Sequence, residues 1–173
     1  YILFLSGLSW RFIGVSSGIF ILSLPFIWNN FLEPFQRERI LTLLDPTADP
    51  YGSAWNITQS KIAIGSGGIT GKGFIEGSQA HLDFLPETET DFIFSVIAEE
   101  FGFIGSAFLL LIYAIIIYRI LVIGSTSRSY FAKLFCYSFG AAIFVYIAIN
   151  MSMVLGLLPI VGSPLPIMSY GGS

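Results

Sequence analysis

Residues 105–123 read GSAFLLLIYAIIIYRILVI, a run of apolar side chains with a single charge, on Arg119. An α-helix rises about 1.5 Å per residue and the hydrocarbon core of a bilayer is about 30 Å thick, so roughly 20 such residues can cross it. Arg119 lies near the end of the run, where its long side chain can reach the membrane surface. The segment is therefore predicted to be a transmembrane helix.

Two further stretches have the same character. Residues 12–32 and 134–158 contain no charged side chain, and small residues such as Gly140 let neighbouring helices approach closely. Residues 1–10 are expected to end an earlier span, and residues 159–173 to form a loop toward a further helix. The predicted fold class is an all-α polytopic integral membrane protein, here a fragment with three complete transmembrane helices and a large extracellular loop.

The composition excludes an ordinary water-soluble domain. Of the 173 residues, 54% are hydrophobic and 11% are charged, against roughly 25% charged in soluble domains. A formal net charge of -3 argues against a nucleic-acid-binding protein, because such a protein needs basic surface to meet phosphate. Cys136 is the single cysteine and His81 the single histidine, which excludes an internal disulfide and a Cys/His zinc site.

The charges are unevenly distributed along the chain. All 11 acidic residues lie between Glu33 and Glu100, together with four basic ones. Three of the other four basic residues lie in or beside residues 124–133: Arg119, Arg128 and Lys133. Because cytoplasmic loops of membrane proteins are enriched in Lys and Arg, residues 124–133 are expected to be a cytoplasmic loop. Residues 33–104 and 159–173 are then extracellular.

The large extracellular loop has its own pattern. Residues 34–44 (PFQRERILTLL) predict an amphipathic helix at the membrane interface, ended by Asp45-Pro46, and a short helix is expected around residues 59–64. A glycine-rich run follows at residues 65–73 (GSGGITGKG). A nucleotide P-loop needs Ser or Thr after its lysine, whereas Lys72 precedes Gly73. Two readings stay open for this run: a flexible backbone turn, or a cradle for a pyrophosphate.

An acid-rich stretch, residues 83–94 (DFLPETETDFIF), leads toward the second span. Thr90 is expected to cap a helix with Asp91 in its first turn, and a spacing of four puts Asp91, Ser95 and Glu99 on one face. The acids form either a capped and solvated helix face or the setting of a general base at the membrane surface.

Four stretches carry a resemblance to a known family: residues 39–50 (RILTLLDPTADP), 59–74 (QSKIAIGSGGITGKGF), 83–105 (DFLPETETDFIFSVIAEEFGFIG) and 156–173 (GLLPIVGSPLPIMSYGGS). The chain resembles the C-terminal half of RodA-type members of the SEDS (shape, elongation, division and sporulation) family of bacterial peptidoglycan glycosyltransferases. Its Lys61-containing stretch is more similar to the RodA type than to the FtsW-type division relatives.

The resemblance implies polymerisation of lipid II during cell elongation. It places the protein in the bacterial cytoplasmic membrane with its active site on the outer face. It implies a class B penicillin-binding protein, other elongation-complex proteins and membrane lipid as partners. The family's essential aspartate falls on Asp91 and a second acidic position on Asp83, while Glu89 stands where the family usually has His. Transfer is expected to be inverting, with Asp91 as base or with assistance from a metal.

The remaining candidate residues would bind the substrate or a cation. Lys61 and Lys72 could stabilise the leaving pyrophosphate. Further substrate-binding candidates are Gln59, Ser60, Asp83 and Glu87, and the candidate ligands for a divalent cation, Mg or Mn, are Glu99 and Glu100. The alternatives are a flippase for the lipid-linked precursor, the FtsW-like cell-division paralogue and a noncatalytic scaffold. The near absence of ionisable groups from the spans favours surface chemistry over transport.

Overall fold

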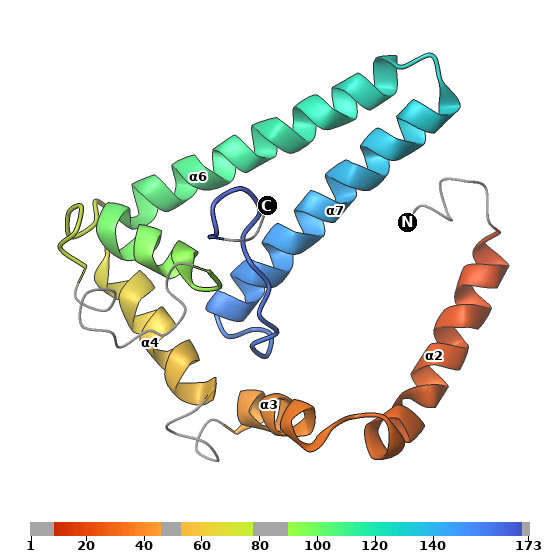
Figure 1. The fold of residues 1–173 in the computed structure, drawn as a ribbon, viewed down its shortest axis with the longest axis horizontal. Helices are drawn as coiled ribbons and strands as arrows, with labels where there is room; N and C mark the ends of the chain where they lie inside the picture. Colours follow the sequence, from red (N-terminus) through yellow and green to blue (C-terminus); the bar gives the residue numbers. More distant parts are fainter. Residues whose placement is uncertain (1–8, 46–52, 78–89, 171–173) are drawn as a thin grey trace.

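The computed structural model describes residues 9–45, 53–77 and 90–170. These residues form five helices and no strand (Figure 1): α2 (Trp10–Asn30), α3 (Pro34–Leu44), α4 (Ser53–Ser66), α6 (Ile93–Thr126) and α7 (Tyr130–Val154). Three of them, α2, α6 and α7, are long and apolar enough to cross a membrane. The expectation of an all-α membrane protein with three such helices is confirmed.

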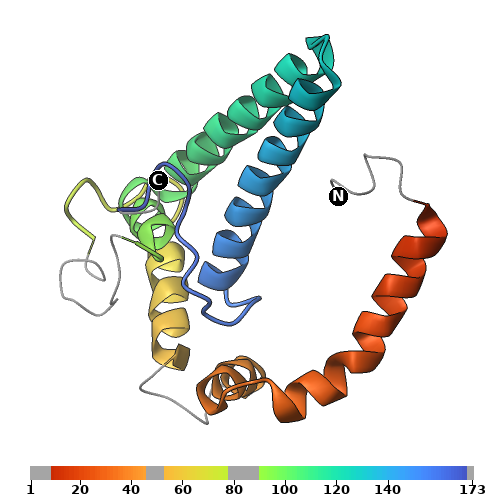
Figure 2. The same ribbon diagram turned by 45° about the vertical axis from the view of Figure 1, so that its right-hand side comes forward.

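Helices α6 and α7 pack side by side as an antiparallel pair (Figures 1 and 2). Small residues allow this approach: a Cβ atom placed on Gly140 would lie 3.5 Å from the side chains of Ile120 and Leu121. One turn further along α6, a Cβ atom on Gly124 would lie 2.9 Å from Cβ of Cys136. Glycine therefore sets the closeness of the pair, as the sequence around Gly140 predicts. Helix α2 stands apart in both views and contains no buried residue.

Helix α7 begins four residues before the predicted span and ends four residues before its predicted end at residue 158. A glycine stops the helix. Gly156 adopts a positive φ of 69°, its N–H donates to the carbonyl of Met153 (2.9 Å), and the N–H of Leu157 donates to that of Ser152 (2.7 Å). This is the Schellman arrangement, in which glycine supplies the left-handed conformation after the last helical turn.

The two helices of the predicted loop are present. Helix α3 has the bounds that the sequence predicts, and it starts with a capping box between Glu33 and Gln36. The backbone N–H of Glu33 donates to the side chain of Gln36 (3.1 Å). Helix α4 is 14 residues long, so it extends well beyond the short helix expected at residues 59–64.

Helix α6 is broken at Gly102, where φ is 65° and ψ is -159°, a conformation that only glycine adopts readily. The glycine-rich run packs against this break. Four backbone hydrogen bonds join the two: Phe103 N to Gly68 O (2.9 Å), Ile104 N to Ile69 O (3.1 Å), Lys72 N to Glu99 O (3.0 Å) and Gly73 N to Glu100 O (3.1 Å). In an unbroken helix these N–H and C=O groups would pair with each other. The run therefore satisfies the groups that the break releases.

The hydrophobic core lies where the start of α6, the end of α7 and the irregular residues 155–170 meet. Its most buried members, each at most 1% exposed, are Phe92, Met153, Val154 and Leu165. Burying each of these side chains contributes about 1.5–3 kcal/mol relative to leaving it exposed. The core therefore holds these segments together at one end of the α6–α7 pair.

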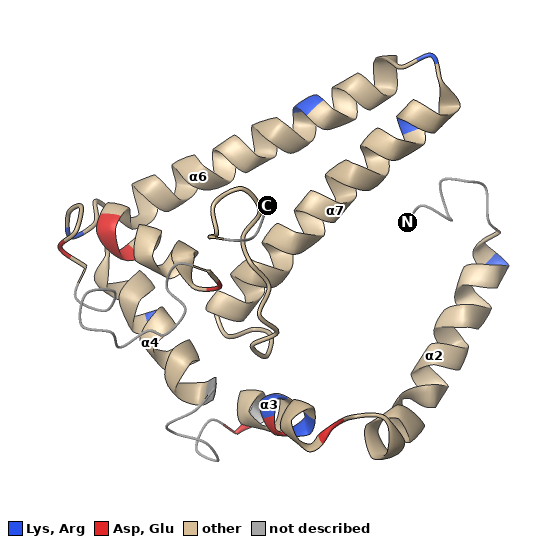
Figure 3. Cartoon of the chain, viewed as in Figure 1, with Lys and Arg blue, Asp and Glu red and all other residues tan. Residues whose placement is uncertain are grey.

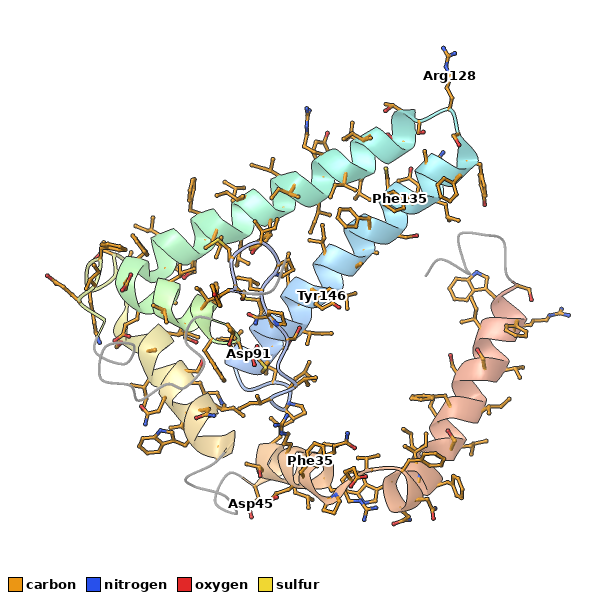
Figure 4. The ribbon with its side chains drawn as sticks, in the orientation of Figure 1. Phe35, Asp45, Asp91, Arg128, Phe135 and Tyr146 are labelled. Carbon is orange, nitrogen blue, oxygen red and sulfur yellow. The ribbon has the colours of Figure 1, made fainter. Side chains whose placement is uncertain are left out.

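The charged residues separate along the same axis (Figure 3). The described acidic residues lie on or near α3, the glycine-rich run and the first part of α6, whereas basic residues mark the α6–α7 turn and its surroundings. Arg128 projects from this turn at the far end of the pair from Asp91 (Figure 4). The uneven distribution of charge along the sequence therefore corresponds to a difference in charge between the two ends of the α6–α7 pair.

This asymmetry predicts the topology. In a full-length Cys136→Ala background in intact cells, Ser53→Cys is expected to react with a membrane-impermeant thiol reagent. Ser127→Cys should react only after the cells are opened, because residues with excess Arg and Lys stay in the cytoplasm. The reverse labelling pattern would show that the orientation is inverted.

Candidate active site

Residues 155–170, called the site loop below, organise the end of the α6–α7 pair that carries Asp91. Hydrogen bonds join this loop to α3, to α6 and the segment just before it, and to α7. The bonds are Arg39 Nη1 to Ile160 O (2.9 Å), Asn150 Nδ2 to Ser163 O (2.6 Å), Tyr113 Oη to Pro166 O (2.5 Å) and Ser169 Oγ to Thr90 O (2.6 Å). The site loop lacks regular structure, yet its backbone accepts side-chain hydrogen bonds at three points and its Ser169 side chain donates a fourth bond.

Asp91 lies just before helix α6 and not in its first turn. The predicted cap at Thr90 is wrong: the N-cap is Phe92 and the helix begins at Ile93. The reason is a competition for carbonyl groups. The carbonyl of Thr90 accepts a hydrogen bond from the Ser169 side chain (2.6 Å), and that of Asp91 accepts one from the Asn150 side chain (2.9 Å). The N–H of Ser95 donates instead to the carbonyl of Phe92 (2.9 Å). Tertiary contacts thus delay the helix by two residues.

The carboxylate of Asp91 is partly buried and faces the site loop. A Cβ atom placed on Gly162 would lie 3.4 Å from Oδ2 of Asp91, so glycine leaves room beside the carboxylate. Figure 4 shows Asp91 where α4, the first part of α6 and the site loop converge. A carboxylate at such a junction is held by its backbone beside the site loop.

Lys61 contacts the same loop. A Cβ atom on Gly156 would lie 2.6 Å from Nζ of Lys61, so the ammonium group rests against the glycine that ends α7. The carbonyls at a helix C-terminus carry partial negative charge, which favours a cation there. Two glycines of one loop, Gly156 and Gly162, therefore lie against the candidate cation and the candidate base.

The neighbours of Lys61 on α4 face inward. Ser60 is 0% exposed, and its Oγ lies 2.7 Å from Oγ of Ser95 and donates to the carbonyl of Val154 (2.9 Å). Gln59 is also buried. Ser60 thus joins α4 to α6 and to the end of α7, and both substrate-binding candidates are buried, whereas the Lys61 side chain is exposed.

Lys72 and Glu99 form an ion pair, with Nζ 2.7 Å from Oε1. The Glu99 side chain is 1% exposed and that of Lys72 31%, so burial removes most water from the carboxylate. The backbone N–H groups of Gly71, Lys72 and Gly73 donate to carbonyls of the protein. The donors of Lys72 and Gly73 bind α6 and that of Gly71 closes a turn onto Gly67 within the run, which favours the turn interpretation over a pyrophosphate cradle.

The cation candidates Glu99 and Glu100 each have a partner within the protein. Oε1 of Glu99 is engaged by Lys72, and Oε1 of Glu100 accepts the N–H of Ile75 (3.2 Å). Within residues 9–45, 53–77 and 90–170, no three His, Cys, Asp or Glu side chains gather as metal ligands would. This donor set does not fit a divalent cation at Glu99. Asp83 and Glu87 lie outside the described residues.

Two residues of the site were missed from the sequence: Asn150 and Ser169. Each binds the backbone on the N-terminal side of α6, at Asp91 and at Thr90. A signal for Asn150 was present, because an amide within an otherwise apolar span must find partners inside the protein. Ser169 carried no comparable signal, since serine is common in loops.

Comparisons with known proteins show which family this chain is similar to. A family model described as cell cycle protein, named for FtsW, RodA and SpoVE, matches residues 1–173. The chain is 48% identical over 173 residues to the peptidoglycan glycosyltransferase MrdB of Escherichia coli (strain K12), covering 100% of this chain and 47% of MrdB. It is 40% identical over 142 residues to the peptidoglycan glycosyltransferase RodA of Treponema pallidum (strain Nichols), covering 82% of this chain and 33% of that protein.

A solved structure is also similar. One chain of a peptidoglycan synthase complex, studied for the coordination of polymerization and crosslinking, matches with a TM-score of 0.71 and 33% identity. The match covers 99% of this chain and 46% of that one. The present chain thus spans about half the length of the relatives it matches, and its fold is that of the corresponding half of the solved chain.

Proposed function

Because the chain belongs to the FtsW, RodA and SpoVE family of cell cycle proteins, we propose that the whole protein is a peptidoglycan glycosyltransferase that polymerises lipid II. The observation that carries the proposal is the placement of Asp91 and Lys61 against two glycines of the one site loop. A base and a cation at one end of a membrane helix pair suit a reaction between two lipid-linked substrates.

Asp91 acts as the general base in this proposal. The acceptor sugar hydroxyl is a weak nucleophile until its proton is removed, and a positioned carboxylate can take that proton as the new glycosidic bond forms. The bond between the donor sugar and its lipid pyrophosphate breaks in the same step. If the acceptor attacks opposite to the leaving group, the configuration at the sugar carbon inverts without a covalent enzyme intermediate.

Lys61 stabilises the pyrophosphate that leaves. Its side chain is exposed and rests against Gly156, so it can reach a bound anion without breaking a buried contact. Lys72 is the weaker candidate, because its ammonium pairs with Glu99. The proposal assigns the proton transfer to Asp91 and places no divalent cation at Glu99, whose Oε1 is engaged by Lys72.

We further propose a role in cell elongation at the outer face of the bacterial cytoplasmic membrane. The similarity to MrdB and to RodA supports this assignment, and the FtsW-type role in division, carried by relatives of comparable identity, is the alternative. The solved relative belongs to a synthase complex that couples polymerization with crosslinking. That relationship supports a class B penicillin-binding protein as the partner, with other elongation-complex proteins and membrane lipid around it.

The direct test uses the full-length protein, purified with its penicillin-binding partner, and fluorescent lipid II. Glycan strands resolved on a gel are expected. A parallel assay in vesicles separates the alternative function: movement of lipid II between leaflets without polymer would favour a transporter, and the absence of both activities would favour a scaffold.

Lys61→Met is expected to slow glycan synthesis about 10- to 100-fold at saturating lipid II, because a hydrogen bond to a charged group contributes about 1.5–3 kcal/mol. Turnover of purified full-length protein measures the effect. Lys133→Met, which removes a lysine at the opposite end of the α6–α7 pair, serves as the control. Normal turnover of Lys61→Met would remove Lys61 from the leaving-group site.

A further inference from the structure

Asn150 is a buried amide at the end of an apolar helix. It lies four residues before the last residue of α7, Val154, and is 0% exposed. Its Nδ2 group donates two hydrogen bonds, to the carbonyl of Asp91 (2.9 Å) and to that of Ser163 (2.6 Å). One side chain therefore joins the backbone of Asp91 to the site loop next to Gly162, the residue that faces the Asp91 carboxylate.

The other amide atom makes Asn150 unfavourable as a packing residue. Its Oδ1 is buried and has no hydrogen-bond partner within the described part of the chain. A buried acceptor without a partner destabilises a folded protein. Packing alone would thus favour an apolar side chain at this position. The two hydrogen bonds that Nδ2 donates remain as the physical reason for an amide.

Ser169 completes the arrangement at the preceding residue. Its Oγ donates to the carbonyl of Thr90 (2.6 Å) and accepts the N–H of Leu165 (2.7 Å). Two consecutive carbonyls, those of Thr90 and Asp91, are therefore fixed by side chains from outside α6. The main chain at Asp91 is held in place before the helix begins.

We propose that Asn150 is a positioning residue for Asp91: it holds the segment with the base in register with the site loop. This inference rests on the proposed function of Asp91. Asn150 acts through the backbone and does not touch the reacting atoms. A displacement of about 1 Å in an active site can lower the rate about 100-fold, so loss of the two hydrogen bonds acts on turnover.

The test compares full-length Asn150→Leu and Asn150→Asp with the wild-type protein. Both variants are expected to lower kcat for lipid II by about 10- to 100-fold while KM stays nearly constant. Ser138→Ala is the matched control, since it removes a side-chain hydrogen bond to a backbone carbonyl on the same helix, that of Leu134. It is expected to leave kcat unchanged.

Two further measurements distinguish positioning from general damage. Asn150→Leu combined with Asp91→Asn should be no slower than Asp91→Asn alone, because positioning an absent base has no effect. Backbone hydrogen exchange in residues 90–95 and 160–165 should become faster in Asn150→Leu and not in Ser138→Ala.

The outcomes separate the two proposals. A normal kcat for Asn150→Leu, losses that multiply in the double variant, or unchanged exchange in both segments would overturn the positioning role. If Asp91→Asn alone polymerised lipid II at the wild-type rate, Asp91 would not be the base. In that case the positioning role would be judged from hydrogen exchange alone: faster exchange in Asn150→Leu would support it and unchanged exchange would overturn it.

Discussion

Asp91→Asn is expected to lower the rate of lipid II polymerisation by about 10² to 10⁴-fold in the full-length protein, the usual effect of losing a general base. The amide keeps the size of the carboxylate but cannot take the acceptor proton. The backbone contacts of Asp91 with Asn150 and of Thr90 with Ser169 use main-chain carbonyls. The variant should therefore fold, insert into the membrane and bind its partner normally.

The measurement is the initial rate with purified lipid II, alongside the amount of protein in the membrane and its binding to the penicillin-binding partner. Glu38→Gln is the matched control, because it neutralises an exposed acid on α3. Polymerisation by Asp91→Asn at the wild-type rate would exclude Asp91 as the base, and equal losses in both variants would point to the charge of the region as a whole.

The largest expected effect on stability comes from the ion pair between Lys72 and Glu99. Lys72→Met leaves the Glu99 carboxylate, 1% exposed, without its cationic partner. Breaking a buried pair from one side typically costs about 3–5 kcal/mol. The melting temperature of the purified full-length protein is expected to fall by several degrees, as measured by thermal unfolding in detergent.

Replacement of both partners separates the ion pair from local packing. Lys72→Met with Glu99→Met should restore most of the lost stability, since exchanging a whole buried pair for apolar groups is often neutral or stabilising. Lys133→Met, at an exposed position, controls for the loss of one positive charge. An unchanged melting temperature for Lys72→Met would mean that the pair contributes little.

The sequence predicted most of the fold because its signals are local. A continuous apolar run decides a membrane helix by itself, and the proline after Glu33 together with Asp45 marks the bounds of α3. The ends of the other helices depended on distant contacts. Helix α6 starts late because Asn150 and Ser169 bind the carbonyls before it.

The site was predicted in part, for a related reason. The family resemblance identifies Asp91 as the candidate base, and the position of the lysines beside a glycine-rich run identifies them as candidate binders of an anion. Residue types do not show which lysine is already paired, however. The Lys72–Glu99 ion pair joins residues that are 27 positions apart in the sequence. The hydrogen bond from Asn150 to Asp91 joins residues that are 59 positions apart. Such pairings follow from packing in three dimensions and have no signature along the chain.

The backbone hydrogen bonds between the glycine-rich run and the break in α6 limit how this run can change in length during evolution. The carbonyls of Gly68 and Ile69 pair with one side of the break, and the N–H groups of Lys72 and Gly73 pair with the other. One residue inserted or deleted between these pairs would shift the donors away from their acceptors and leave backbone groups unpaired, which is costly near lipid. Thr70, which is exposed within this run, can change its side chain freely while the spacing around it stays fixed.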